Sequence, residues 1–260
     1  MEIGLIDEFV TDWRLSGKSP KTASEYRGHL VSLLRISSSP DLPTAKNWLL
    51  ATRSASVRRK RCQALRAFGA WCSNSGMVGF EWIRQLPLAT EEVLPQPTAT
   101  EADYERARRV LTSPRDLLAV EILWTCGLRR SEVANLKVED VDFAGSNLIV
   151  RLTKNRRPRV VPISPSLKVS LRRWLQGRRS GAVLLMTSNA IRLMLQREEL
   201  PSAHAWRRGW AVHTLKSGVS EASLRAAAGW ASGAMVARYT QALSQELAIA
   251  EFQRVWQKNA

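Results

Sequence analysis

Four separated segments in the second half of the chain hold the side chains best suited to chemistry on a phosphate ester. They are residues 126–142, which open with Cys-Gly-Leu-Arg-Arg-Ser-Glu, residues 153–162 around Lys154, residues 204–207 with the sequence His-Ala-Trp-Arg, and residues 229–240, which run from a Gly-Trp pair to Tyr239. Opening a phosphodiester without a metal needs a nucleophile that stores the bond energy in a covalent ester. It also needs fixed donors for the phosphate oxygens, and arginine suits that task because it stays charged and offers a planar fork.

The net charge of the chain indicates what kind of partner it has. The 260 residues include 39 Lys and Arg against 23 Asp and Glu, a formal charge of +16. Such a balance favours a polyanion, either nucleic acid or an acidic membrane surface. No stretch approaches the roughly 20 uncharged apolar residues of a membrane span, and the acidic start does not match a signal peptide. We therefore expect a soluble cytoplasmic protein with no membrane partner.

Cofactor motifs are not apparent in the sequence. The three cysteines have no metal-like spacing, and no cluster of Asp, Glu, His and Cys indicates a metal site. No glycine-rich loop indicates a bound nucleotide. We expect neither a metal nor an organic cofactor.

The first 90 residues predict a basic helical domain. Apolar spacing indicates four helices, beginning near Leu5, Pro20, Pro43 and Ser54. The fourth carries a basic run on the face opposite its apolar stripe, namely Arg58, Arg59, Lys60, Arg61 and Arg66. Such a run is as often a solvated helix face as a binding site. The excess of 13 Lys and Arg over 7 Asp and Glu in residues 1–90 favours phosphate contact.

A boundary follows at residues 86–100, where three prolines and no helical stripe predict an extended linker. Thr100 then resembles a helix N-cap, with Asp103 in the first turn. We accordingly divide the chain into a helical domain at 1–88, a linker at 89–99 and a second domain at 100–260.

The second domain is predicted to be mostly helical with one small sheet, so the fold class is mainly α with an α+β catalytic part. The runs 147–152 and 159–163 predict a hairpin, and 182–186 is a candidate third strand. Helices are expected near residues 166–176, 188–199, 203–217, 220–229, 233–241 and 244–258.

The ordered set of four segments resembles the tyrosine recombinase, or phage integrase, family. The family pattern is Gly-Leu-Arg-x-Ser-Glu, a hairpin lysine before Val-Pro, His-x-x-Arg, and Gly-His/Trp with a tyrosine nine residues later. Here Tyr239 follows Trp230 by nine positions, and the match covers roughly residues 95–245. Residues 1–90 fit the helical core-binding domain of the family in length and type. The resemblance implies two domains that clamp a DNA duplex, in a minimal form without an arm-binding domain.

The resemblance assigns the phosphate contacts to Arg129 and Arg207. Arginine cannot lose a proton at neutral pH, so the departing 5′-oxygen needs a titratable donor, and the hairpin position of the family assigns Lys154 to it. Thr153 and Asn155 stand where the family usually has glycines. The spacing of Arg129 and Glu132 also fits a salt bridge along a helix, and both roles hold if Glu132 orients the guanidinium. Two further loop residues, Arg156 and Arg157, are predicted to bind DNA.

The proton transfers and the nucleophile complete the expected site. His204 is the candidate for accepting the tyrosyl proton or hydrogen-bonding the phosphate, and Tyr239 is the nucleophile. Trp230 replaces the commoner histidine, and its indole can donate a hydrogen bond but cannot carry a proton. Arg208 stands where the family often has a second histidine, and His213 is interpreted as a packed helix residue.

The predicted function is a metal- and ATP-independent, site-specific DNA recombinase or integrase, DNA-associated in a prokaryotic host or mobile element. It would form a 3′-phosphotyrosyl intermediate and act as a homo-tetramer on two double-stranded DNA sites. Two alternatives remain at this point: a type IB topoisomerase-like relaxase, and a non-catalytic DNA-binding regulator of the same fold. The amphipathic tail at 244–260 is expected to dock on a neighbouring protomer, and packing on its own domain is the alternative.

Overall fold

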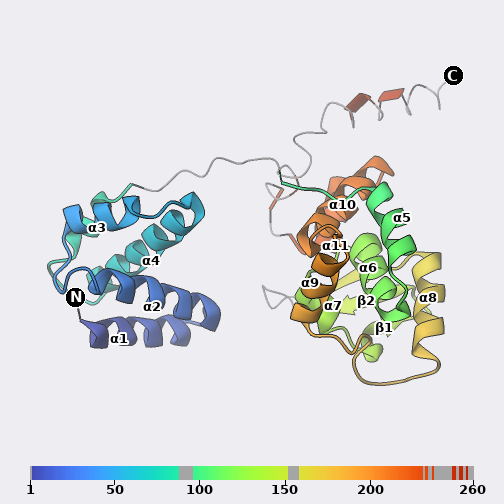
Figure 1. The fold of residues 1–260 in the computed structure, drawn as a ribbon, viewed down its shortest axis with the longest axis horizontal. Coiled ribbons are helices and arrows are strands. Elements are labelled where there is room, and N and C mark those ends of the chain that lie inside the picture. Colours follow the sequence, from blue (N-terminus) through green and yellow to red (C-terminus); the bar gives the residue numbers. More distant parts are fainter. Residues whose placement is uncertain are drawn as a thin grey trace. The chain divides into compact units, whose positions relative to one another are not determined.

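The computed structural model divides the chain into two compact units, Met1–Leu94 and Pro95–Ala260, which are described separately (Figure 1). It describes residues 2–87, 96–151 and 158–230, together with 232, 233, 236, 248, 249, 252, 253 and 256. Four predicted site residues lie outside this set: Lys154, Arg156, Arg157 and Tyr239. So do most of the helices predicted at 233–241 and 244–258.

The first unit contains the four predicted helices. They are α1 (Ile3–Leu15), α2 (Pro20–Leu34), α3 (Leu42–Leu50) and α4 (Ala55–Asn74), followed by a short 3-10 helix, η1 (Glu81–Gln85), that the sequence pattern did not predict. α3 begins earlier than expected because Asp41 is its N-cap and accepts a hydrogen bond from the backbone N–H of Thr44. The core joins α1 to α4 through an edge-to-face contact of Phe9 and Phe68.

The second unit is built mainly from helices. They are α5 (Glu101–Val110), α6 (Pro114–Cys126), α7 (Arg130–Ala134), α8 (Pro165–Leu175), α9 (Ser188–Arg197), α10 (Ala203–Lys216) and α11 (Glu221–Ala228), with a 3-10 turn, η2 (Val138–Asp140). Thr100 and Asp103 form the predicted capping box at the start of α5. The last part of the predicted linker is already packed here, because Ala99 is buried and its N–H donates to the carbonyl of Ala205.

The small sheet is antiparallel in the order β1-β2-β3, with β1 (Val141–Asp142), β2 (Asn147–Val150) and β3 (Arg159–Pro162). The predicted hairpin is therefore present, with Val150 opposite Arg159. The prediction of a strand at 182–186 is wrong. Ala182 makes a single bridge with Lys137, and the carbonyl of Val183 accepts a hydrogen bond from the indole of Trp174. Side chains therefore bind backbone carbonyls that a neighbouring strand would need as hydrogen-bond acceptors. The third strand of the sheet is β1 instead.

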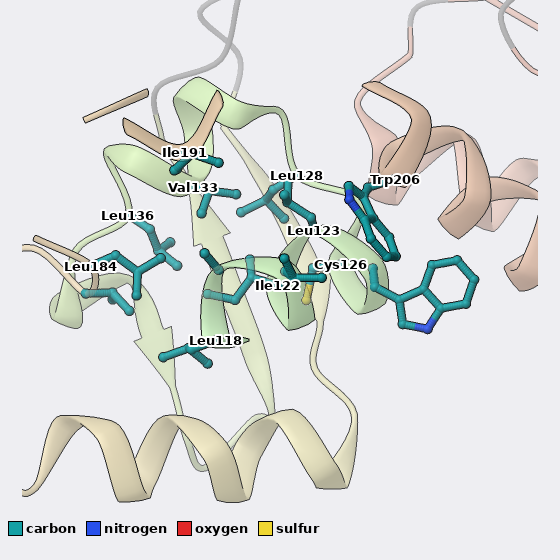
Figure 2. Close-up of a cluster of buried hydrophobic side chains, with 14 of the residues drawn as sticks. Leu118, Ile122, Leu123, Cys126, Leu128, Val133, Leu136, Leu184, Ile191 and Trp206 are labelled. Atoms are coloured by element: carbon teal, nitrogen blue, oxygen red, sulfur yellow. The ribbon is translucent and has the colours of Figure 1, made fainter. Parts of the chain in front are cut away.

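The core of the second unit forms around α6, which contacts α5, α7, α8, α9 and α10. Leu118, Ile122, Leu123 and Cys126 of α6 meet the side chains of the following segment, of α9 and of α10 in one cluster (Figure 2). Among the described residues no helix is long and apolar enough to cross a lipid bilayer. The burial of α6 on nearly every side fixes its C-terminal end, where the first chemical segment begins.

Gly127 ends α6 in the left-handed region, at φ +58°. A Cβ at this position would overlap the ring of Trp210 on α10. Glycine is required here for two reasons, the sign of φ and the close approach of an indole. The turn itself therefore packs against α10.

We expect Gly127→Ala to destabilise the protein more than Gly177→Ala does. Gly177 also has a positive φ, of +81°, but nothing lies within 4 Å of a Cβ built there. Both variants lose about 1–2 kcal/mol from left-handed strain, and Gly127→Ala loses about 1–3 kcal/mol more from overpacking. Urea denaturation measures the two free energies of unfolding. Equal losses would contradict the packing argument.

Candidate active site

Arg129 stands at the junction between the Gly127 turn and α7, where it is the N-cap residue. Its backbone N–H donates to Oε2 of Glu132 at 2.8 Å, and its Nη1 donates to Oε1 of the same carboxylate at 2.8 Å. The ion pair expected from the spacing is therefore present. The Arg129 side chain keeps 24% of its surface exposed, so part of it stays accessible beside its contact with Glu132.

Glu132 is buried, with only 1% of its side chain exposed, and it is shared by two arginines. Arg159 on β3 donates to both oxygens, from Nη1 at 2.9 Å and from Nη2 at 2.7 Å. Burial raises the pKa of Glu132, but the hydrogen bonds from Arg159 and Arg129 outweigh it and hold the pKa at about 2. The carboxylate is thus a fixed negative charge at neutral pH.

Arg159 is a site residue that the sequence reasoning missed. Its side chain is 6% exposed, and its Nε also donates to the carbonyl of Ala227 at 2.8 Å. The signal that could have identified it is the alternation of inward and outward positions along a strand. In β3, Arg159 and Val161 are buried while Val160 is exposed. An arginine at an inward strand position needs a buried acceptor.

Arg207 on α10 joins three of the four chemical segments. It is 3% exposed and donates to the carbonyl oxygens of Gly127 and, at 2.7 Å, of Ala228. Its guanidinium also lies 5.3 Å from the ring centroid of Trp230, which is itself buried. Arg207, the Gly127–Arg129 segment and Trp230 are therefore neighbours, as the sequence reasoning predicts.

The ends of two helices converge on Arg207. Gly127 is the C-cap of α6, and Ala228 is the last residue of α11, which ends at Gly229 in the left-handed region. Helix C-termini leave carbonyl groups without helical partners and carry partial negative charge. The carbonyl dipoles of these two helix ends therefore help to balance the buried cation.

His204 lies in the first turn of α10 and is exposed. Partial burial lowers its pKa, and the nearby charges of Arg208, Arg207, Arg129 and Arg130 lower it further. The imidazole is therefore neutral at pH 7 and able to accept a proton. These charge interactions also place His204 in the field of the same arginine cluster.

Three residues that lie near the candidate site in the sequence make contacts of their own: Arg130, Arg208 and His213. Arg130 donates from Nε to Oγ of Ser188 at 2.9 Å, which agrees with the choice of Arg129 from the Gly-Leu-Arg register. Arg208 donates to the carbonyl of Pro97 at 2.7 Å. His213 is more exposed than its interpretation as a packed residue implies, although its ring lies 5.3 Å from that of Trp124.

Several arginines of the basic run on α4 already bind backbone carbonyls of the first unit. Arg58 donates to the carbonyl of Thr52, Arg61 donates to that of Trp48 and stacks over its ring, and Arg66 donates to that of Leu86. Lys60 is 3.8 Å from a carboxylate oxygen of Glu25, so one acid does face the run. These contacts hold loops in place, and DNA contact by Arg58, Arg59, Lys60, Arg61 and Arg66 stays a prediction.

Comparison with known proteins decides the family. The sequence model described as the phage integrase family matches residues 100–246. The chain belongs to the phage integrase family. Within the residues that the structure describes, no group of His, Cys, Asp and Glu is arranged to hold a metal ion.

Relatives of this recombinase match along nearly the whole chain. Tyrosine recombinase XerA of Pyrococcus horikoshii is 26% identical over 94% of this chain and 90% of its own length. Tyrosine recombinase XerC of Mycobacterium tuberculosis is 29% identical over 91% of this chain and 93% of its own length. The protein is thus a tyrosine-type site-specific recombinase, and the topoisomerase and regulator alternatives are not favoured.

Solved structures show the same fold. The Tn1549 transposon integrase in complex with transposon right end DNA aligns with a TM-score of 0.74 and 18% identity, over 96% of this chain and 99% of that one. A lambda integrase dimer bound to a core site aligns with a TM-score of 0.73 and 16% identity, over 91% and 76% of the two chains. The mainly helical architecture with a small antiparallel sheet is that of these recombinases.

We expect the stability difference between the parent protein and Glu132→Gln to shrink as the pH falls. The folded-state pKa of about 2 lies below the ordinary value of 4.5, so the ionised carboxylate stabilises the fold fully above pH 4.5 and loses this effect toward pH 2. The shift corresponds to about 3 kcal/mol. Urea denaturation at pH 7, 5 and 3 measures the difference, with the exposed Glu139→Gln as control. A constant difference would refute the assignment.

Proposed function

We propose that this recombinase cleaves double-stranded DNA with Tyr239 as the nucleophile. The tyrosyl oxygen forms a bond to the scissile phosphorus, the bond to the 5′-oxygen breaks, and a 3′-phosphotyrosyl ester is left. The 5′-hydroxyl of a partner strand then reverses the step and releases the tyrosine, so no ATP or metal enters the balance. The DNA in the Tn1549 and lambda integrase complexes supports DNA as the partner.

The observation that carries this proposal is the arginine cluster at the ends of α6 and α11. Arg207 is fixed to the carbonyl of Gly127, two residues before Arg129, so the two guanidiniums belong to one rigid neighbourhood. Nη1 of Arg129 donates to Glu132, and the side chain is 24% exposed. We infer that its exposed side binds a non-bridging oxygen of the phosphate, where negative charge grows in the transition state.

Two proton transfers complete the step. His204, neutral at pH 7, accepts the tyrosyl proton or donates a hydrogen bond to the phosphate. Lys154 protonates the departing 5′-oxygen, because the arginines near it cannot titrate. Trp230 packs beside the guanidinium of Arg207, so its contribution is to confine that side chain while its N–H is a donor.

We further propose that four protomers act together on two duplexes, with residues 1–88 and 100–260 on either side of the DNA. The basic run of α4 would contact one face of the duplex, and Arg156 and Arg157 would contact phosphates near Lys154.

The tail offers one support for assembly in trans. Its residues Ile249, Phe252 and Trp256 follow helical spacing and are each 59–65% exposed. An apolar face of this kind suits burial on a neighbouring protomer.

A nicked suicide duplex tests the chemistry. Cleavage upstream of the nick releases a short 5′-hydroxyl strand, so the adduct accumulates. We expect a covalent adduct through Tyr239 to the 3′-phosphate, formed equally well in EDTA. Tyr239→Phe should bind the duplex with unchanged affinity and form no adduct. Peptide mapping of the adduct to another residue would overturn the mechanism.

A 5′-bridging phosphorothiolate separates the general acid from the phosphate donors. Sulfur leaves without needing a proton, so this substrate should restore most of the cleavage rate of Lys154→Ala. It should restore little of the rate of Arg129→Ala, which loses transition-state charge stabilisation of about 3–4 kcal/mol by analogy with oxyanion sites. Single-turnover cleavage rates measure both effects. Equal rescue of the two variants would exclude Lys154 as the acid.

Deletion of residues 244–260 tests the exchange of the tail. We expect the truncated protein to bind a single site nearly as well as the parent but to form no tetrameric complex and no recombinants. Sedimentation with DNA measures the assembly, and a plasmid recombination assay measures the product. A truncated protein that still assembles and recombines at the parent rate would show that the tail packs in cis.

A further inference from the structure

We propose that Arg159 is a positioning residue for DNA cleavage, which acts through Glu132 on the direction of the Arg129 guanidinium. This inference rests on the proposed contact of Arg129 with the scissile phosphate. Arg159 itself has no reason to touch DNA, because its side chain is 6% exposed and three of its nitrogens are bonded inside the protein.

The first step of the argument is the charge of Glu132. Burial alone pushes the pKa of this carboxyl upward, and the largest opposing effect is the hydrogen bonding from Arg159. Arg129 contributes a backbone N–H and a single side-chain donor. Without Arg159 the carboxylate would lose two of its four donors, and its hold on Arg129 would weaken.

The second step is the geometry at the end of α11. Nε of Arg159 binds the carbonyl of Ala227, while the next carbonyl along the chain, that of Ala228, binds Arg207. Gly229 lies so close that a Cβ there would be 2.8 Å from Cδ of Arg159. Arg159 therefore braces the peptide segment that holds the second phosphate-binding arginine as well.

The third step is the residue type. Arg159 serves three acceptors at once, the two oxygens of Glu132 and the carbonyl of Ala227, at 2.7–2.9 Å. A guanidinium matches this planar set, whereas a lysine ammonium would keep the charge but not the fork. Arg159→Lys thus removes the orientation while leaving Glu132 a cationic partner.

A methylphosphonate at the scissile position provides the test. The methyl group replaces one non-bridging oxygen and removes the negative charge, so a correctly aimed Arg129 matters less for this substrate. Single-turnover rates of adduct formation are measured on matched phosphate and methylphosphonate suicide duplexes. We expect Arg159→Lys and Arg159→Gln to lose about 10- to 100-fold on phosphate, the range known for second-layer partners of catalytic metal sites. On methylphosphonate they should lose much less, as Arg129→Ala should.

Arg151→Gln is the matched control. Arg151 also pairs with a buried carboxylate and continues the strand that pairs with β3, but its carboxylate is that of Asp140 and not that of Glu132. Its ratio of phosphate to methylphosphonate rates should equal that of the parent. Urea denaturation identifies any variant that fails to fold, and Arg159→Lys then decides alone, since it leaves no buried charge without a cation.

The outcomes distinguish a failure of the proposed function from a failure of the role proposed for Arg159 alone. A parent protein that forms no Tyr239 adduct on phosphate would overturn the proposed function and this inference with it. A parent that cleaves, with folded Arg159 variants whose rate ratio is unchanged, would overturn this inference alone. Rescue of those variants by the 5′-phosphorothiolate in place of the methylphosphonate would also overturn it, because that result would place the effect of Arg159 on the leaving group.

Discussion

The arrangement of the second unit, Pro95–Ala260, depends on one buried charge, the carboxylate of Glu132. Moving a carboxylate out of water costs several kcal/mol even after relaxation, and only well-placed donors offset that cost. Here the donors come from the first chemical segment and from a distant strand: Arg129 supplies two and Arg159 supplies two. The fold is therefore constrained to bring β3 against α7. Under the proposed role of Arg129, the carboxylate that holds β3 against α7 is also the group that orients the Arg129 guanidinium.

Arg207 is stabilised by a different kind of interaction, and this difference matters for chemistry. Its partners at the ends of α6 and α11 are backbone carbonyls, which offset a buried cation without neutralising it. Carbonyl groups carry no net charge, so these two hydrogen bonds hold the guanidinium in place without cancelling its positive charge. Gly127 and Gly229 make this arrangement feasible, because their left-handed turns end the two helices at the cluster.

Local sequence patterns predicted most of the elements, and the failures have identifiable physical causes. The cap at Thr100 depends on neighbours in the chain, so pattern reasoning finds it. The segment at 182–186 is apolar enough for a strand, but side chains of α8 and of the following turn take its backbone acceptors. The arginines of α4 look like a free basic face in sequence, yet Arg58, Arg61 and Arg66 bind backbone carbonyls that lie 6, 13 and 20 residues away in the chain.

The sequence alone indicated the family and the candidate site residues, because residue types, their spacing and their order along the chain can be read without a structure. It identified Arg129, Glu132, Arg207 and Trp230, which the structure brings together around the ends of α6, α10 and α11. Only the tertiary structure revealed the contacts of Arg159 with Glu132 and Ala227. Its partner is 27 residues away in the chain, and a buried arginine and an exposed one have the same letter. The hydrogen-bond acceptors around an ionised side chain decide whether it stabilises the fold or stays accessible to a ligand. For Arg159 those acceptors come together only in the tertiary structure, where β3, the end of α11 and the carboxylate of Glu132 meet.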